Sequence, residues 1–418
     1  MGAGEAVAGC VAPPQKHHDM TRKRERRARI LRWAATMVVG LLGAGTLLAF
    51  TSEPAGWLLA PLCLMGAAAI GHRFMIAPPG VAILTYHSVS PAPGWLPWSR
   101  EVAVHPRTFA RHLEVLQRIG AAVLPTRVLV THRAAGAALP QRPVAIHFDD
   151  GYYDNHRFAA PLLRQHGFGA TFFPSLDFIE PDGSPRRVDA VEGYMRWSEL
   201  AELAAVPGFE VEPHGVAHAR VPVSDRTVGI LDSSNWRANA WLQWAATPGP
   251  KYDWFRQSAP VAVPLGTPIP ASGLALAVPA WIGGAPETPH AFASRIEGDL
   301  SECRATFLAR LGYVPRIFCW PENKSCAEGR RIARSIGYTA TTGGTGRNTA
   351  DEPAEILSRI HIGDRALGFR WLAAEALHFR GSVRLMQGNH YWYLVLAPMN
   401  LTRRLVFALR RLLRDDFA

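Results

Sequence analysis

Residues 144–155 read VAIHFDDGYYDN, an apolar, strand-like run that stops at two adjacent carboxylates, Asp149 and Asp150, before Gly151. Two like charges at a strand end repel each other unless something compensates them. An Asp-Asp-Gly run is also common turn material. The neighbouring segments must therefore decide whether the pair has a chemical role.

Strand-like runs alternate with amphipathic helical runs on both sides of this stretch. The apolar residues of 105–120 recur at helical spacing, and two further helix–strand units follow the aspartates. These units are FAAPLLRQHG-F-GATFFP (158–174) and RWSELAELAAVPG-FEVEPH (196–214). This alternation predicts an α/β fold built on a parallel sheet or barrel.

Charge is unevenly distributed along the 418 residues. The net charge is +11, and much of it lies in KHHDMTRKRERRARILR (16–32) and in LTRRLVFALRRLLR (401–414). The first run precedes an apolar segment and the second is amphipathic, so both favour contact with an anionic membrane surface. No nucleic-acid-binding motif is visible, and we expect no nucleic-acid partner.

Two apolar runs are candidates for a membrane anchor. Trp33–Phe50 has 18 residues without a charge, just enough to cross a bilayer. Trp57–Gly71 is shorter and is followed by His72 and Arg73. One span would place the rest of the chain outside the cytoplasm, whereas a two-span hairpin would return it to the cytoplasm. The sequence leaves this alternative open.

These patterns divide the chain into four parts. We expect a disordered basic N-terminus (1–32), a membrane anchor (33–74), a catalytic domain (78–370) and a C-terminal extension with a basic amphipathic helix (371–418). A Trp- and Pro-rich segment at 221–290 breaks the helix–strand rhythm and is expected to be an insertion. The five cysteines form no metal-binding doublet and indicate isolated thiols.

Three polar features fall at predicted strand ends, where α/β folds gather their functional groups. They are Asp149-Asp150, the pair His214 and His218, and the run FCWPEN (318–323). Two neutral imidazoles and one carboxylate are a suitable ligand set for zinc, with a fourth position left for water. A second carboxylate beside a ligand can accept the proton when water attacks. A divalent cation would also compensate the charge of the aspartate pair.

With these motifs in view, residues 80–365 resemble the polysaccharide deacetylases of carbohydrate esterase family 4, the NodB-homology domain. HFDDGY and HGVAH resemble that family's first and second motifs in the correct order. ILTYHSV and FARHLEVLQRIG resemble the branch that deacetylates exopolysaccharides of the poly-N-acetylglucosamine type. The resemblance implies a distorted (β/α) barrel, preceded by the one or two membrane segments.

The resemblance also implies a role for individual residues. Asp149 would be the general base, and Asp150, His214 and His218 would bind a divalent metal, with zinc the first choice by ligand type. A histidine late in such domains is the general acid, and His361 in LSRIHIG stands at the corresponding point.

The third motif departs from the family. It usually contains an arginine that orients the base and, three residues on, a tyrosine, but Cys319 and Glu322 stand at those positions. What holds Asp149 is therefore open at this stage. Residues beside the motifs are expected to bind substrate: Tyr152, Trp320, Pro321 and Glu322.

The function that follows is a metal-dependent hydrolase that removes N-acetyl groups from a polysaccharide or amino sugar. Two alternatives remain: a deformylase or deacetylase of a polyprenyl-phosphate-linked amino sugar, and an inactive glycan-binding scaffold in polysaccharide export. The expected partners are an N-acetylated glycan, the membrane and proteins of polysaccharide synthesis or export. The expected location is the bacterial inner membrane, with the side of the catalytic domain left open.

Overall fold

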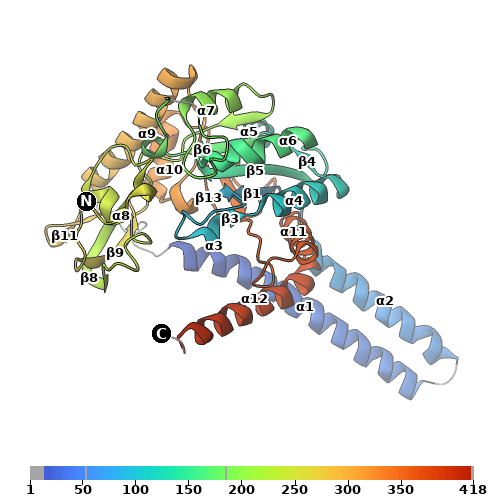
Figure 1. The fold of residues 1–418 in the computed structure, drawn as a ribbon. Coiled ribbons are helices and arrows are strands. Elements are labelled where there is room, and N and C mark those ends of the chain that lie inside the picture. Colours follow the sequence, from blue (N-terminus) through green and yellow to red (C-terminus); the bar gives the residue numbers. More distant parts are fainter. Residues whose placement is uncertain (1–13, 52–53, 184–185, 416–418) are drawn as a thin grey trace, which may run out of the picture. The chain divides into compact units, whose positions relative to one another are not determined.

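The computed structural model describes residues 14–51, 54–183 and 186–415. The chain forms two compact units (Figure 1). The sheet unit contains Ile83–Gly344 and Ala350–Asp364. The helical unit contains Pro14–Ala82, Thr345–Thr349 and the chain from Arg365 onward.

One parallel sheet forms the centre of the sheet unit. Its strand order is β12-β13-β14-β1-β5-β6-β7, with β4 beside β5. The pairs β12–β13, β13–β14, β14–β1, β4–β5, β5–β6 and β6–β7 are parallel. The strands are β1 (Ala82–Tyr86), β4 (Ala122–Val123), β5 (Pro143–Asp150), β6 (Ala170–Pro174), β7 (Phe209–Val211), β12 (Ile317–Phe318), β13 (Ala340–Gly344) and β14 (Ile356–His361). Residues 143–149 of β5 are buried, as expected for a strand covered on both faces.

The two edges of the sheet approach each other without forming a regular ladder. The Cys319 N–H donates to the Pro213 carbonyl over 3.0 Å. The Glu212 carboxylate, just beyond β7, accepts the backbone N–H groups of Arg316 and Ile317 at 2.9 and 3.0 Å. The sheet therefore curves back on itself, and the predicted distorted (β/α) barrel is confirmed.

Helices connect successive strands and cover the sheet (Figure 1). Of these, α4 shows how the sequence sets the bounds: His105 caps its N-terminus, Pro106 opens it, and Phe109, Leu113 and Leu116 are buried at helical spacing. The helices are α3 (Ser99–Val102), α4 (Pro106–Arg118), α5 (Thr126–Ala134), α6 (Ala160–His166), α7 (Trp197–Ala204), α9 (Pro289–Leu311) and α10 (Ala327–Ile336). Two short strands, β2 (Ser88–Val89) and β3 (Ala103–Val104), pair after β1.

The segment expected to be an insertion, 221–290, contains a long β-hairpin and an apolar cluster of its own. Strands β8 (Arg220–Ile230) and β9 (Pro268–Leu274) pair antiparallel. The hairpin is accompanied by α8 (Trp241–Ala246), β10 (Trp281–Ile282) and β11 (Ala285–Pro286). Trp236 and Trp241 are buried within the segment, whereas Trp254 is buried against Trp98 and Tyr194 outside it.

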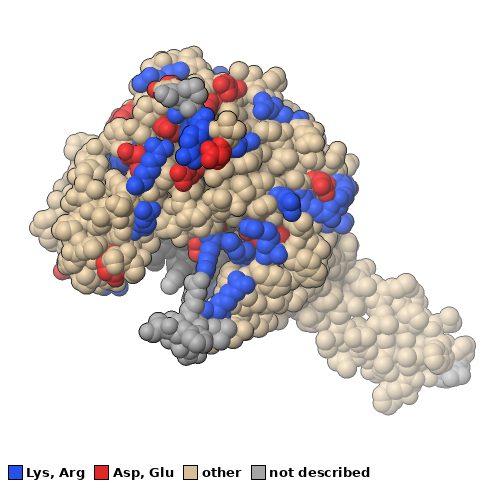
Figure 2. Space-filling view, in the orientation of Figure 1, with Lys and Arg blue, Asp and Glu red and all other residues tan. Residues whose placement is uncertain are grey.

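The helical unit begins with a helical hairpin, α1 (Pro14–Phe50) and α2 (Ala55–Met75). Among the residues that the structure describes, these two helices are long and apolar enough to cross a membrane. A Cβ at Gly40 would collide with Ala67, so the helices approach closely through small residues. In the space-filling view the outer part of the hairpin shows almost no charged side chains (Figure 2).

The expectation of disorder up to residue 32 is wrong for its described part, because α1 already begins at Pro14. Arginine, lysine, glutamate and alanine are good helix formers, and no glycine or proline interrupts residues 21–39. The helix of the apolar run therefore extends toward the N-terminus through the basic cluster. The unit is completed by α11 (Leu372–Met386) and α12 (Trp392–Asp415).

Candidate metal centre

Three of the predicted site residues meet at the carboxyl end of the sheet. Asp150 ends β5, while His214 and His218 follow β7. The Asp150 Oδ1 atom lies 3.4 Å from His214 Nε2 and 3.8 Å from His218 Nε2. Bonds of about 2.0–2.1 Å in a tetrahedral zinc site separate two ligand atoms by roughly 3.3–3.4 Å. The spacing of Asp150, His214 and His218 therefore fits a small divalent cation.

The orientation of His214 is fixed by its other ring nitrogen. His214 Nδ1 lies 2.8 Å from the Cys319 carbonyl oxygen, which makes Nδ1 the protonated nitrogen and leaves Nε2 as the free lone pair. A second group of potential ligands, Asp149, His214 and Cys319, overlaps the first. In that group both carboxylate oxygens of Asp149 are engaged by a guanidinium. The group with Asp150 is therefore the better metal site.

The backbone at the aspartate pair turns sharply. Asp150 and Gly151 have φ angles of 72° and 75°, a left-handed conformation that glycine adopts without strain and that other residues rarely take. A Cβ at Gly151 would lie 2.8 Å from the Pro174 side chain. The Asp-Asp-Gly sequence thus lets the chain turn directly after β5 while Asp150 still points into the site.

A second segment holds this turn in place. The Met195 N–H donates to the Gly151 carbonyl at 2.8 Å, and the Tyr153 N–H donates to the Gly193 carbonyl at 3.0 Å. Tyr152 and Tyr194 pair as an isolated β-bridge between these contacts. Residues 193–195 therefore brace the residues immediately after the candidate metal ligand.

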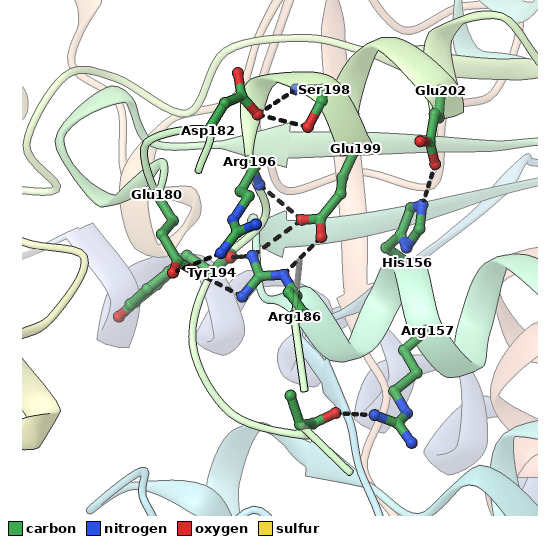
Figure 3. Close-up of polar contacts among 11 residues, drawn as sticks. His156, Arg157, Glu180, Asp182, Arg186, Tyr194, Arg196, Ser198, Glu199 and Glu202 are labelled. Carbon is green, nitrogen blue, oxygen red and sulfur yellow. Dashed lines mark hydrogen bonds and ion pairs between the residues drawn. The ribbon is translucent and has the colours of Figure 1, made fainter. Parts of the chain in front are cut away.

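The bracing segment is tied down by a largely buried ion-pair cluster (Figure 3). Arg186 forms ion pairs of 2.6 Å with both Glu180 and Glu199, and it donates to the Tyr194 carbonyl. Its guanidinium also lies 4.0 Å from the centre of the Tyr153 ring. Arg186 thus contacts both Tyr194 of the bracing segment and Tyr153 of the turn that this segment holds.

Asp149 is buried beside Asp150 and is held by Arg359 on β14. Arg359 Nη1 donates to Asp149 Oδ1 at 2.7 Å and Nη2 donates to Oδ2 at 2.9 Å. Burial raises the pKa of Asp149, but the Arg359 charge and nearby imidazoles outweigh it and hold this pKa below its usual range. Asp149 is therefore an ionised carboxylate in a site that would otherwise protonate it.

Arg359 answers the question left by the altered third motif. Cys319 occupies the position of the expected arginine, with its Sγ atom 3.6 Å from Asp149 Oδ1. The guanidinium comes instead from a different strand. A sequence signal for it exists: Arg359 stands two residues before His361, and alternate residues of a strand face the same side.

His361 lies at the end of β14, with its Nε2 atom 2.7 Å from the Glu101 carbonyl. Its ring centre is 5.2 Å from that of His87, a residue that the sequence analysis did not select. Partial removal from water, followed by the His87 charge, lowers the pKa of His361 to about 4. His87 Nδ1 is buried and has no hydrogen-bond partner among the described residues. Its charge also lowers the pKa of Asp149 and Asp150, which brings His87 into the site.

The residues expected to bind substrate lie in different environments. Trp320 has no exposed surface and packs 4.7 Å from the Phe318 ring, so the expectation that it contacts a sugar is wrong. Trp320 follows the short strand β12, and its indole lies in a buried cluster instead. Pro321 is buried, and Tyr152 is only 2% exposed. Glu322 is accessible and forms ion pairs with Arg220 and Lys324.

A curved parallel α/β sheet with a carboxylate–imidazole cluster at its strand ends defines the class as an α/β-barrel protein with a candidate metal centre. Residues 136–256 match the family model described as polysaccharide deacetylase. This region contains β5, the aspartate pair and both candidate histidine ligands. The chain thus carries a polysaccharide deacetylase domain, which confirms the predicted family and the prediction of a deacetylase enzyme.

Solved structures with a similar backbone include a de-N-acetylase from Aggregatibacter actinomycetemcomitans (17% identity, 67% of this chain and 94% of that chain, TM-score 0.48). Another is the BpsB deacetylase domain from Bordetella bronchiseptica (18% identity, 69% of this chain and 97% of that chain, TM-score 0.49). A third is IcaB from Ammonifex degensii (18% identity, 72% of this chain and 97% of that chain, TM-score 0.46). No curated protein matches the sequence significantly. Function therefore rests on the family match and on the site itself.

Proposed function

We propose that this chain removes N-acetyl groups from an N-acetylated glycan of the cell envelope, with an exopolysaccharide of the poly-N-acetylglucosamine type as the first candidate. One observation carries the proposal. In a domain of the deacetylase family, an ionised Asp149 stands next to the potential ligand set Asp150, His214 and His218. Base and metal would thus be held within reach of the same water molecule.

The donor set fits a divalent ion, and zinc is the first choice because two imidazoles and one carboxylate suit it. When bound, such an ion supplies Lewis acidity toward water and toward the amide carbonyl. Asp149 accepts the proton of the attacking water. Because Arg359 fixes both of its oxygens, the remaining lone pairs of Asp149 are held in a constant direction.

The leaving amine needs a proton, and two imidazoles are positioned to supply it. His361 is the residue that the sequence motif suggests, but a pKa near 4 leaves its imidazole neutral at pH 7 unless the reaction itself delivers a proton. His87 has a free buried Nδ1 and acts electrostatically on both aspartates. The unpartnered Nδ1 and the neighbouring His361 ring make His87 a second candidate for the general acid.

A lipid-linked amino sugar is the second candidate substrate. The observation that favours it is the helical hairpin α1–α2, whose two helices are apolar and long enough to place this domain at a bilayer. This hairpin also supports a location in the bacterial inner membrane. A two-span hairpin would keep the domain on the cytoplasmic side, where undecaprenyl-type precursors are accessible, and reporter fusions would identify that side.

The test is acetate release by the full chain in detergent from chitin-type and β-1,6-linked N-acetylglucosamine oligomers and from a polyprenyl-phosphate-linked N-acetyl sugar. We expect a chelator to abolish release and zinc to restore it. Asp149→Asn should retain metal but lose turnover, and His214→Ala should lose metal. The exposed His290→Ala serves as the matched histidine control. Equal metal content in Asp149→Asn and His214→Ala would contradict the separate roles.

His87→Gln and His361→Gln separate the two candidate acids. The variant that lacks the true general acid should lose kcat most strongly for substrates whose amine is a poor leaving group. It should also lose the basic limb of the pH profile. If neither variant changes that limb, the proton comes from another group. No acetate from any of these substrates, with metal bound, would contradict the proposed function itself.

A further inference from the structure

Helix α12 (Trp392–Asp415) has a continuous apolar stripe that faces outward. The five leucines of this stripe are each between 43% and 64% exposed. Spacings of seven, four, four and three residues place them on one side of a helix. The stripe consists of Leu394, Leu401, Leu405, Leu409 and Leu412.

The stripe is not the face by which α12 packs within its unit. Leu396 and Met399 are buried, and Met399 packs with Ala366 and Ala374. Farther along, Gly368 lies against Val406, and Arg410 donates to the Gly368 carbonyl at 2.9 Å. The helix therefore has a separate packing face and presents its leucine stripe away from it.

The charges of α12 suit an anionic surface. Its sequence contains five arginines and one aspartate. Arg404 is exposed and follows Leu401 by three residues, which places it beside the stripe. So many arginines prevent the helix from spanning a bilayer, and α12 is not among the candidate spans in the described part of the chain. An amphipathic helix of this composition lies in the membrane interface.

The start of α12 lies at one end of the α1–α2 hairpin. The Tyr391 ring is 6.4 Å from the Trp33 ring, where the apolar run of α1 begins. The Tyr391 hydroxyl is 3.2 Å from His72 Nδ1, near the end of α2. The His390 N–H donates to the Met75 carbonyl at 2.8 Å. Tryptophan and tyrosine at the ends of apolar helices mark the level of lipid head groups. Within this unit, α12 runs crosswise to α1 and α2 (Figure 1).

We propose that α12 binds along the surface of an anionic membrane, with the leucine stripe among the acyl chains and the arginines at the lipid head groups. A second copy of the chain is a poorer occupant, because its arginine-flanked stripe would repel an identical helix. One helix face also offers less area than a stable dimer requires. The proposal concerns membrane contact and is independent of the deacetylation chemistry.

The test uses the full chain reconstituted in vesicles of phosphatidylcholine and phosphatidylglycerol. An environment-sensitive fluorescent amino acid replaces Leu405 or, as a control, the exposed Leu265 of the sheet unit. Bromine atoms on the acyl chains should quench the probe at position 405 several-fold more than the probe at 265. Aqueous iodide should show the opposite order. Equal access of iodide to both probes would overturn the proposal.

A matched pair of variants isolates the stripe. With the probe at 405, Leu401→Glu with Leu409→Glu should reduce bromine quenching to the control level. Val261→Glu with Leu265→Glu, which adds the same charge at exposed apolar positions of the sheet unit, should not. A probe at 405 shielded from iodide but not quenched by brominated lipid would instead mean a protein occupant and would also overturn the proposal. Quenching that is unchanged in pure phosphatidylcholine would overturn the role assigned to the arginines.

Discussion

Arg359 and Asp149 form a bidentate ion pair although they are separated by 210 residues in the sequence. The two parallel hydrogen bonds, 2.7 and 2.9 Å long, fix the plane of the carboxylate as well as its charge. Both side chains are almost completely buried, at 3% and 2% exposure. The pair therefore keeps the buried Asp149 carboxylate ionised and oriented, which its proposed role as general base requires.

Replacing Arg359 should impair the base without removing the metal. In Arg359→Gln, only the nearby imidazoles still oppose the effect of burial on Asp149, so its pKa rises and a larger fraction of the carboxylate is protonated at a given pH. We expect kcat/KM to fall by roughly 10²-fold, within the range of general base catalysis, and its acidic limb to move to higher pH. The kcat/KM of Arg359→Lys should lie between the values of Arg359→Gln and of the unchanged protein, because lysine restores the positive charge but not the two parallel hydrogen bonds of the guanidinium.

The control is Arg334→Gln, since Arg334 forms an exposed ion pair with Glu355 on the surface of the sheet unit. Its activity and pH profile should match those of the unchanged protein. An unaltered acidic limb in Arg359→Gln, with metal content intact, would show that Arg359 does not set the pKa of Asp149.

Asp154 should make stability depend on pH. This buried carboxyl accepts hydrogen bonds from the Ser88 hydroxyl at 2.5 Å and the Val89 N–H at 3.0 Å, and burial raises its pKa to about 7. The folded state therefore binds the proton more tightly than the unfolded state. The stabilisation is complete below the unfolded pKa and is lost as pH rises through about 7. The difference from 3.8 corresponds to roughly 4 kcal/mol.

Asp154→Asn removes this titration, so the thermal unfolding midpoint should fall less between pH 5.5 and pH 8.5. Some slope remains because burial also raises the pKa of Glu212 and Asp299 to about 7. The exposed Asp225→Asn should leave the slope unchanged. Identical slopes for Asp154→Asn and the unchanged protein would contradict the prediction.

Trp320 should matter for stability rather than for substrate binding. Its indole lies in a buried cluster with Phe318 and Ile332, so Trp320→Ala should cost about 3–5 kcal/mol of unfolding free energy by leaving a cavity. Trp320→Phe should be better tolerated, with KM unchanged. Chemical denaturation and steady-state kinetics on the same samples separate the two effects. A raised KM with unaltered stability would restore Trp320 as a sugar-binding residue.

Arg186 should support the metal site from a distance. Arg186→Met leaves Glu180 and Glu199 without their shared partner and should cost about 3–5 kcal/mol, since breaking a buried ion pair strands the remaining charge. The loosened brace at Gly151 should weaken zinc affinity by about tenfold, in the range that supporting interactions around a metal contribute. Calorimetric zinc titration measures this effect.

The neighbouring Arg187→Met is the matched control because Arg187 is 80% exposed and pairs with Asp189 on the surface. Zinc affinity that is equal in the two variants would mean that the cluster only stabilises the fold.

The sequence was informative where periodicity and strand order carry the signal. Alternating helices and strands predict the parallel barrel, and the carboxyl ends of parallel strands bring Asp150, His214 and His218 to one edge. Arg359 could not be found by motif position, because the fold supplies the guanidinium from another strand than the one expected. The burial of Trp320 could not be predicted either, because a sequence motif does not show which of its side chains point into the core.

Each of the two units is built from segments that are not consecutive in the sequence. Within the part of the chain that the structure describes, the backbone passes between the two units four times, after residues 82, 344, 349 and 364. Within the helical unit, Arg347 donates to the Pro78 carbonyl at 2.9 Å. A single proteolytic cut after residue 82 therefore leaves the sheet unit joined covalently to the later segments of the helical unit. A truncation that removes the first two helices and also Pro78 would take away this partner of Arg347.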